Sequence, residues 1–116
     1  MKNVPLLILI IIIFFFVKKR WFDNTDYNSI VKNGGILLDV RSSSEFLNGH
    51  IKGAKNIPLS EINERIDELK DKNQFIITHC ASGIRSQNAK MILSSKGYQN
   101  VINGGGWRSL NTKLKR

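Results

Sequence analysis

Two short apolar runs restrict the fold of this chain more than any other feature. Residues 36–40 and 75–79 are near-continuous stretches of large apolar side chains. Runs of this kind are typical of central strands that are covered on both faces. Stretches with helical spacing of apolar residues lie before, between and after them. This alternation predicts an α/β domain with a mostly parallel sheet.

The remaining elements follow from shorter signals. Shorter strands are expected at residues 55–57 and 100–102, the second ended by a glycine turn at 104–106. Helices are expected from Thr25 to Val31, from Ser60 through Leu69, from Ser86 to Ser95 and after Trp107, with a short turn at 43–47. A chain of 116 residues forms one small domain. We assign residues 21–116 to it.

The first 20 residues differ in character from the rest. Val4–Val17 contains no charged or polar side chain, and residues 6–16 are Leu, Ile and Phe alone. Fourteen helical residues extend about 21 Å, which is short of a hydrocarbon core of ~30 Å. A signal-peptide segment and a buried helix are therefore alternatives to a membrane span.

The flanks of this run favour a transmembrane anchor over residues 1–20. Lys2 precedes the run and residues 18–20 are basic, so their long side chains can extend the span. Trp21 and Phe22 follow, where an interfacial aromatic belt would lie, and no small-residue cleavage site is found. Three positive side chains after the run against one before it predict a single-pass cell-membrane protein whose domain faces the cytoplasm.

Charge and cysteine content exclude several classes of function. The formal net charge is +9, but without residues 1–20 it falls to +5, and no basic helix alternates with aromatic residues. We therefore expect no nucleic-acid partner and interpret the charge as a solvated surface, one that could face anionic lipid. A single cysteine rules out an intrachain disulfide and a Cys-rich zinc site. No metal is expected.

The stretch His-Cys-Ala-Ser-Gly-Ile-Arg-Ser, residues 79–86, joins the second apolar run to a helix. In α/β folds, sites lie at such turns, beyond the carboxyl ends of parallel strands. Gly83 permits a backbone angle or a close approach that a side chain would block, so the loop N–H groups and the helix N-terminus can converge on Cys80. That convergence would stabilise a thiolate. Arg85 adds planar donors suited to sulfonate, phosphate or sulfate oxygens.

At this point the sequence resembles a known family. Cys80-x-x-Gly83-x-Arg85-Ser86 is similar to the active-site loop of single-domain rhodanese-like sulfurtransferases. Further motifs of that family occur in the same order: Leu38–Arg41 with Glu45-Phe46, His50–Pro58, Gly97–Val101 and Gly104–Trp107. The resemblance extends over nearly all of residues 25–116. It implies the rhodanese fold, in which helices flank a central, mostly parallel sheet.

The resemblance also implies a mechanism. Cys80 would take a sulfane sulfur from a donor such as thiosulfate, form a persulfide, and pass the sulfur to cyanide, a small thiol or a protein cysteine. The residues expected to hold the anion are Ala81, Ser82, Gly83, Ile84, Arg85 and Ser86, and Ser86 could equally cap the following helix. No metal or organic cofactor is implied.

Loop length distinguishes this chemistry from that of phosphatase and arsenate-reductase members of the family. Those members enclose a longer loop between Cys and Arg, whereas Ala81–Ile84 here are four residues. The narrower ring fits a sulfur atom better than a phosphoryl group. Asp39 and Arg41 follow the first strand, and we expect them to support the site through hydrogen bonds and an ion pair rather than to react.

The alternative function is a non-enzymatic rhodanese-like interaction module at the membrane. A module that only binds a partner needs no reactive loop. Intact Cys80, Gly83 and Arg85 argue against it.

Overall fold

A single parallel sheet organises the molecule, for which the computed structural model describes residues 5–21 and 24–114, with the side chains of residues 17–21 left undescribed. Within those residues the strand order is β2-β1-β3-β4, and every neighbouring pair is parallel. The strands are β1 (Ile36–Asp39), β2 (Lys55–Asn56), β3 (Ile76–Cys80) and β4 (Val101–Gly106). The predicted α/β class with a parallel sheet is confirmed.

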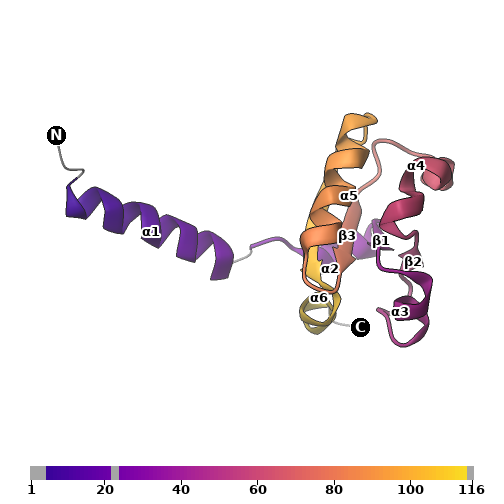
Figure 1. Ribbon diagram of the computed structural model, residues 1–116, viewed down its shortest axis with the longest axis horizontal. Helices are drawn as coiled ribbons and strands as arrows, with labels where there is room; N and C mark the ends of the chain where they lie inside the picture. The colour runs from indigo at the N-terminus through magenta and orange to yellow at the C-terminus, as the bar shows by residue number, and fades with distance from the viewer. Residues whose placement is uncertain (1–4, 22–23, 115–116) are drawn as a thin grey trace.

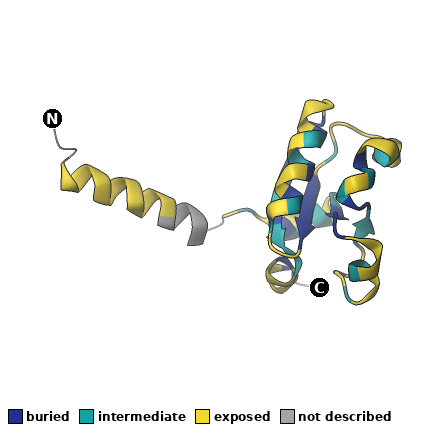
Figure 2. Ribbon diagram, viewed as in Figure 1, coloured by how far each residue is buried: buried dark blue, intermediate teal, exposed yellow. Residues whose placement is uncertain are grey.

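Helices cover both faces of the sheet (Figure 1). α2 (Tyr27–Lys32) and α6 (Trp107–Lys113) pack on one face, around Leu37 and Ile77. α4 (Ile62–Arg65) and α5 (Ile84–Ser95) pack on the other face, around Leu38 and Ile76. Successive strand residues face opposite sides, so β1 and β3 need apolar residues at nearly every position. The buried strands accordingly lie between the two helical layers (Figure 2).

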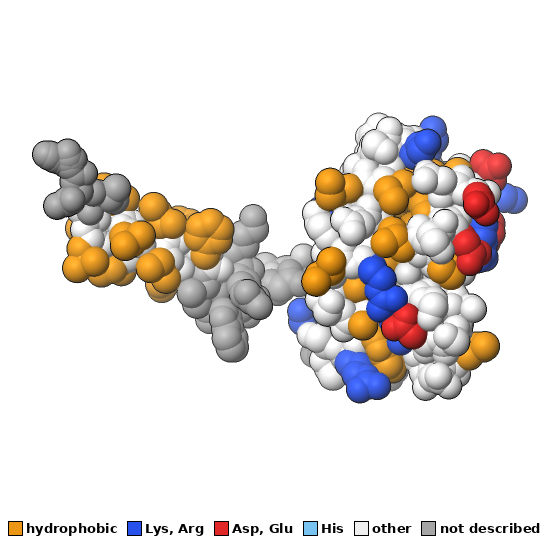
Figure 3. All heavy atoms as spheres, in the orientation of Figure 1, with side chains coloured by type: hydrophobic (Ala, Val, Ile, Leu, Met, Phe, Trp, Pro, Cys, Tyr) orange, Lys and Arg blue, Asp and Glu red, His pale blue; other side chains and the backbone are white. Residues whose placement is uncertain are grey.

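Short connections complete the fold and agree with most of the expected positions. α3 (Ser43–Leu47) occupies the predicted turn and begins with a capping box between Ser42 and Glu45. The Asp26 side chain, rather than that of Thr25, accepts the Ser29 N–H at the start of α2. Acidic and basic side chains gather over α4 in an exposed network (Figure 3), with Arg65 between Glu61 and Glu68.

Two expected elements differ from the structure. The helix expected from Ser60 to Leu69 is broken into η1 (Leu59–Glu61), α4 and η2 (Ile66–Glu68). The Tyr98 hydroxyl donates to the carbonyls of Ile66 and Leu69, which a continuing helix would use for its own hydrogen bonds. The glycines 104–106 form no turn but extend β4, where glycine is needed at position 106 because a Cβ would lie 2.8 Å from the Ala81 carbonyl oxygen.

The prediction of a single-pass membrane location is wrong. α1 (Leu6–Trp21) has 16 residues, about 24 Å of helix, which is shorter than a hydrocarbon core of ~30 Å. No helix in residues 5–21 and 24–114 has both the length and the apolar content needed to cross a membrane. The predicted transmembrane helix, and with it the membrane as a partner of residues 4–17, is therefore not supported.

The flanks of the apolar run fall largely outside the described residues. Lys2, Val4 and Phe22 lie outside the described residues, as do the side chains of residues 18–21. The apolar side chains of the described part of α1 are exposed, from 44% at Ile12 to 71% at Leu6 and Phe16 (Figures 2 and 3).

Candidate active site

Cys80 is the last residue of β3 and is fully buried, in contact with the core cluster between the sheet and α5. The chain turns through residues 81–83 and enters α5 directly. Gly83 makes this turn possible because its φ of +100° lies in the region that only glycine adopts without strain. The same backbone geometry directs the Gly83 N–H at the Cys80 sulfur, with an N···S distance of 3.0 Å.

Hydrogen bonds around the sulfur favour the thiolate. Burial raises the pKa of the Cys80 thiol, but this is outweighed by the Ser86 side chain and by the backbone N–H groups of Ser86, Gly83 and Ser82, so that the pKa falls below its ordinary value. In the thiol form the Cys80 S–H donates to the Ser86 Oγ, with an S···O distance of 3.5 Å, whereas the backbone N–H groups donate to the sulfur. The loop therefore presents a sulfur that is both sheltered and readily ionised.

Asn103 on β4 connects the loop to the sheet. Its Oδ1 accepts hydrogen bonds from the Ser86 hydroxyl at 2.7 Å and from the Gly105 N–H at 3.0 Å. Its Nδ2 donates to the Gly83 carbonyl at 3.1 Å. Gly83, not Ser86, occupies the N-cap position of α5, which leaves the Ser86 side chain free to face Cys80. Asn103 thus fixes the two residues that contact the sulfur.

Arg85 lies in the first turn of α5 and is held by Glu45 of α3. Its two terminal nitrogens donate to the two carboxylate oxygens at 2.7 and 3.0 Å. The Arg85 hydrogen bond, together with donors from Ser42, lowers the pKa of Glu45 to about 2. In this structure the guanidinium is directed at a carboxylate of the same chain.

Asp39 and Arg41 reach the same edge of the sheet as Cys80 but lie on its other face. They form a buried ion pair at 2.7 Å, and Arg41 also donates to the Gly49 carbonyl and packs over the Trp107 ring. His79 lies beside them, with Nε2 3.7 Å from the Asp39 carboxylate. Burial lowers the pKa of His79, so its ring is neutral near pH 7. The ring nitrogens of His79 have no hydrogen-bond partner among the described residues.

Comparison with known proteins identifies the domain. The family model described as the rhodanese-like domain matches residues 23–113. The chain belongs to the rhodanese-like family. Thiosulfate sulfurtransferase PspE of Escherichia coli is 42% identical over 74 residues, which cover 63% of this chain and 71% of the relative.

Solved structures agree with this assignment. A rhodanese with anions from E. coli superposes with a TM-score of 0.61 at 41% identity, covering 65% of this chain and 89% of that one. The human single-domain sulfurtransferase TSTD1 superposes with a TM-score of 0.67 at 28% identity, covering 78% and 93%. These relatives confirm the rhodanese fold and the predicted enzyme class, a sulfurtransferase.

Within this rhodanese-like domain, the structure brings together only part of the predicted set of site residues. Cys80, Gly83 and Ser86 are in direct contact, and the Ser82 N–H contributes to the low thiol pKa. Ala81 and Ile84 are exposed beside them, and Ile84 is 72% exposed. Arg85 faces Glu45, while Asp39 and Arg41 pair with each other on the opposite face.

Sequence reasoning missed two residues of this arrangement, Glu45 and Asn103. Both fall within or beside motifs that resemble the family, Glu45-Phe46 and Gly104–Trp107. Their partners are 40 and 17 residues away along the chain. Contacts between residues so far apart in the sequence leave no periodic pattern. The motifs themselves were therefore the only sign in the sequence that these two residues belong to the site.

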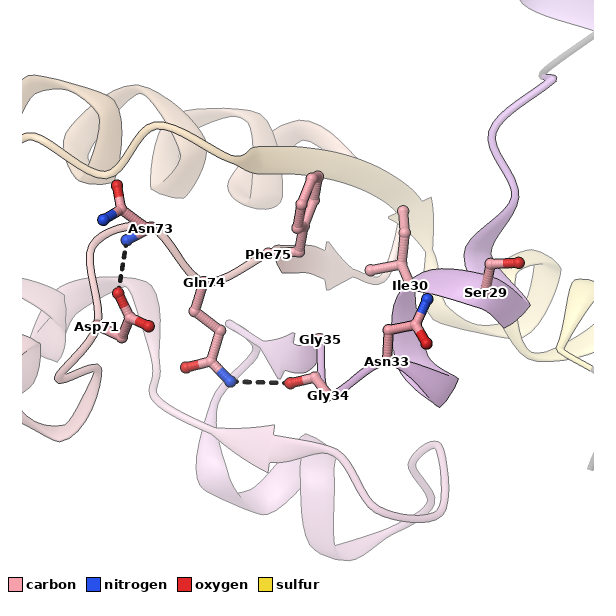
Figure 4. Close-up of a pocket in the computed structure, with 9 residues that line it drawn as sticks. All are labelled: Ser29, Ile30, Asn33, Gly34, Gly35, Asp71, Asn73, Gln74 and Phe75. Carbon is pink, nitrogen blue, oxygen red and sulfur yellow. Dashed lines mark hydrogen bonds between the residues drawn. The ribbon is translucent and has the colours of Figure 1, made fainter.

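A cavity at the other end of the sheet is larger than the groove beside Arg85. It has a volume of about 580 Å³ and is formed by residues before β1 and β3, including Asn33, Gly35 and Phe75. The Gln74 amide crosses it to donate to the Gly34 carbonyl at 2.8 Å (Figure 4). A groove of about 280 Å³ at the opposite end is lined by Val40, Ser42, Pro58, Leu59, Ser60 and Arg85.

Proposed function

We propose that this chain transfers a sulfane sulfur through a persulfide on Cys80, with residues 21–116 as the catalytic unit. The observation that supports this most directly is the set of hydrogen bonds on the Cys80 sulfur, which lower the pKa of the thiol although it is buried. Such a setting is suited to a nucleophilic thiolate.

In the first half-reaction the Cys80 thiolate attacks the outer sulfur of thiosulfate. A new S–S bond forms, the S–S bond of the donor breaks, and sulfite leaves with the bonding electron pair. The product is a Cys80 persulfide that bears the negative charge on its outer sulfur. The N–H groups of Ser82, Gly83 and Ser86 already face the inner sulfur, and we expect the acceptor to approach from the exposed side of the loop, at Ala81 and Ile84.

In the second half-reaction an acceptor thiolate or cyanide attacks the outer sulfur. The persulfide S–S bond breaks, and its electron pair returns to Cys80 as the thiolate. No net oxidation or reduction of the enzyme occurs over the cycle. Arg85 would hold the oxygens of a bound anionic donor, which requires its guanidinium to share or leave the Glu45 carboxylate.

Intact-mass measurement of the full chain tests this function. After incubation with thiosulfate we expect a gain of one sulfur atom, which added cyanide removes. Because Cys80 is the one cysteine in the sequence, no second thiol can account for the adduct. Cys80→Ala is the matched control and should gain nothing. The proposal fails if neither thiosulfate nor an alkyl hydropersulfide loads the native chain.

A further inference from the structure

The cation of the active-site loop is already paired in the structure. Arg85 and Glu45 form two hydrogen bonds, at 2.7 and 3.0 Å, and each side chain is 38% exposed. Bidentate pairing of this kind uses the same fork of N–H donors that a sulfonate would need. A donor oxyanion and Glu45 therefore compete for one guanidinium.

Glu45 is held in place from its other side as well. The Ser42 N–H and hydroxyl donate to its Oε1 at 3.2 and 3.0 Å, in the capping box of α3. With its pKa lowered to about 2, chiefly by the Arg85 hydrogen bond, the carboxylate stays ionised throughout the neutral range. Its position and charge are thus constant features of the site.

The Arg85–Glu45 pair lies at a groove whose wall adjoins the core cluster that contains Cys80. Arg85 and Ser42 line this groove together with Leu59 and Val40. Val40 belongs to the same core cluster as Cys80, and Leu59 packs against that cluster. A donor that enters the groove therefore meets largely apolar walls and a guanidinium whose charge is balanced by a carboxylate.

We infer that Glu45 is a specificity-determining residue that selects sulfur donors by charge. It does so by competing for Arg85, so that a doubly charged donor such as thiosulfate must displace a carboxylate before its sulfonate oxygens are bound. An alkyl hydropersulfide has no sulfonate and loads Cys80 without that displacement. In both cases the thiolate attacks the outer sulfur: for the hydropersulfide, a new S–S bond forms on Cys80 while the donor S–S bond breaks and the alkyl thiolate leaves. The inference rests on the proposed function.

Removing the charge of Glu45 should improve the use of thiosulfate. When a binding group is available for only part of the time, the apparent affinity for its ligand is the intrinsic affinity multiplied by the fraction of time for which the group is available. For a half-exposed ion pair we expect release of the arginine to raise the apparent affinity for thiosulfate about fivefold. Glu45→Gln keeps the size of the side chain and its acceptor for Ser42 but lacks the charge that holds Arg85.

The test is steady-state kinetics of the full chain with thiosulfate and, separately, with a small alkyl hydropersulfide. For Glu45→Gln we expect the KM for thiosulfate to fall about fivefold with kcat within about twofold, and the KM for the hydropersulfide to stay constant. Glu61→Gln is the matched control, because it removes the charge of an exposed ion pair with Arg65 on α4 and should change neither KM.

Two further variants make the result specific to Arg85. In an Arg85→Ala background, Glu45→Gln should no longer change the KM for thiosulfate, since no guanidinium remains to be released. Ser42→Ala, which loosens the carboxylate without altering its charge, should shift the KM in the same direction as Glu45→Gln but less. It also provides a second measurement if Glu45→Gln folds poorly.

Two results would overturn the inference while leaving the proposed function intact. One is an unchanged or higher KM for thiosulfate in Glu45→Gln, which would mean that Glu45 positions Arg85 for the donor instead of competing with it. The other is an equal change for both donors. Absence of sulfur transfer to Cys80 from either donor in the native chain would instead refute the proposed function, and the inference with it.

Discussion

The two ends of the parallel sheet differ in what their loops do. At the carboxyl end, the turn after β3 directs backbone N–H groups at one buried sulfur, and the Arg85–Glu45 ion pair lies at the same end. At the amino end, the turns before β1 and β3 enclose the larger cavity, about 580 Å³, with uncharged amides and glycines on most of its wall (Figure 4). Cavity size alone would favour the amino end, whereas the converging N–H donors favour the carboxyl end as the place of the proposed sulfur transfer.

This difference has a backbone origin. Parallel strands all end at the same edge, and a strand followed directly by a helix brings the unpaired N–H groups of the helix N-terminus to that edge. α5 begins at Ile84, four residues after Cys80, so its first N–H groups lie beside the sulfur. At the amino end of the sheet, the N–H and carbonyl groups of the segments that lead into the strands already form hydrogen bonds within turns. The Gly35 N–H, for example, donates to the Ile30 carbonyl at 2.8 Å.

The largest expected effect is at the sulfur itself. Cys80→Ser keeps a small side chain that can still contact Ser86 and the Gly83 N–H, but an alcohol cannot form a persulfide. We expect sulfur transfer to fall to the uncatalysed rate while the domain remains folded. Turnover with thiosulfate and thermal unfolding, measured on the same preparation, check this. Residual turnover above that rate would show that chemistry occurs elsewhere in the chain.

The next effect concerns stability at the carboxyl end. Arg41→Ala would leave the fully buried Asp39 carboxylate without its partner, and we expect a loss of about 3 to 5 kcal/mol in the free energy of unfolding. Urea unfolding measures it. Arg65→Ala, in the exposed network on α4, is the control and should have a much smaller effect. A small loss for Arg41→Ala would mean that water reaches Asp39 in solution.

The core strands and the turn after Cys80 could be predicted from the sequence because their signals are local. An apolar run such as residues 36–40 indicates a strand wherever it occurs, and a glycine three residues after Cys80 allows the loop to turn. The placement of Cys80 at the carboxyl edge could be predicted as well, because sites in parallel α/β sheets lie beyond the carboxyl ends of the strands.

Features that depend on distant contacts could not be predicted. The break in the helix expected at residues 60–69 depends on the Tyr98 hydroxyl, 29 residues beyond Leu69. The pairing of Arg85 with Glu45 spans 40 residues, so the sequence indicated a free cation where the structure has an occupied one. The apolar run at residues 6–16, with its basic and aromatic flanks, predicted a membrane location that the 16-residue length of α1 does not support.

A moderate effect is expected on thiol reactivity when the loop turn is altered. Gly83→Ala places a Cβ at a φ of +100°, 3.3 Å from the Gly105 Cα, and should displace the N–H that faces the sulfur. If the pKa of Cys80 then rises by about one unit, alkylation at neutral pH slows about tenfold. The pH–rate profile of alkylation by a neutral reagent measures this shift.

The same profile has a matched control and a consequence for stability. Gly97→Ala introduces the same backbone strain after the end of α5, at a φ of +96°, and should leave the alkylation profile unchanged. Because the pKa of Cys80 is lower in the folded chain than in an unfolded one, the thiolate stabilises the fold above the unfolded pKa, and this contribution is lost as the pH falls through the folded pKa. Equal profiles for Gly83→Ala and the native chain would contradict the role of the Gly83 N–H.

The smallest effect is expected at the amino end, and it completes the contrast between the two ends. Gln74→Ala removes one amide hydrogen bond to the Gly34 carbonyl, next to water, so the free energy of unfolding should fall by less than about 1 kcal/mol. Turnover and the alkylation profile of Cys80 should both match those of the native chain, because the sheet separates this cavity from the sulfur. A change in turnover without a change in stability would mean that the cavity communicates with the loop through β3, and that the two ends are not independent.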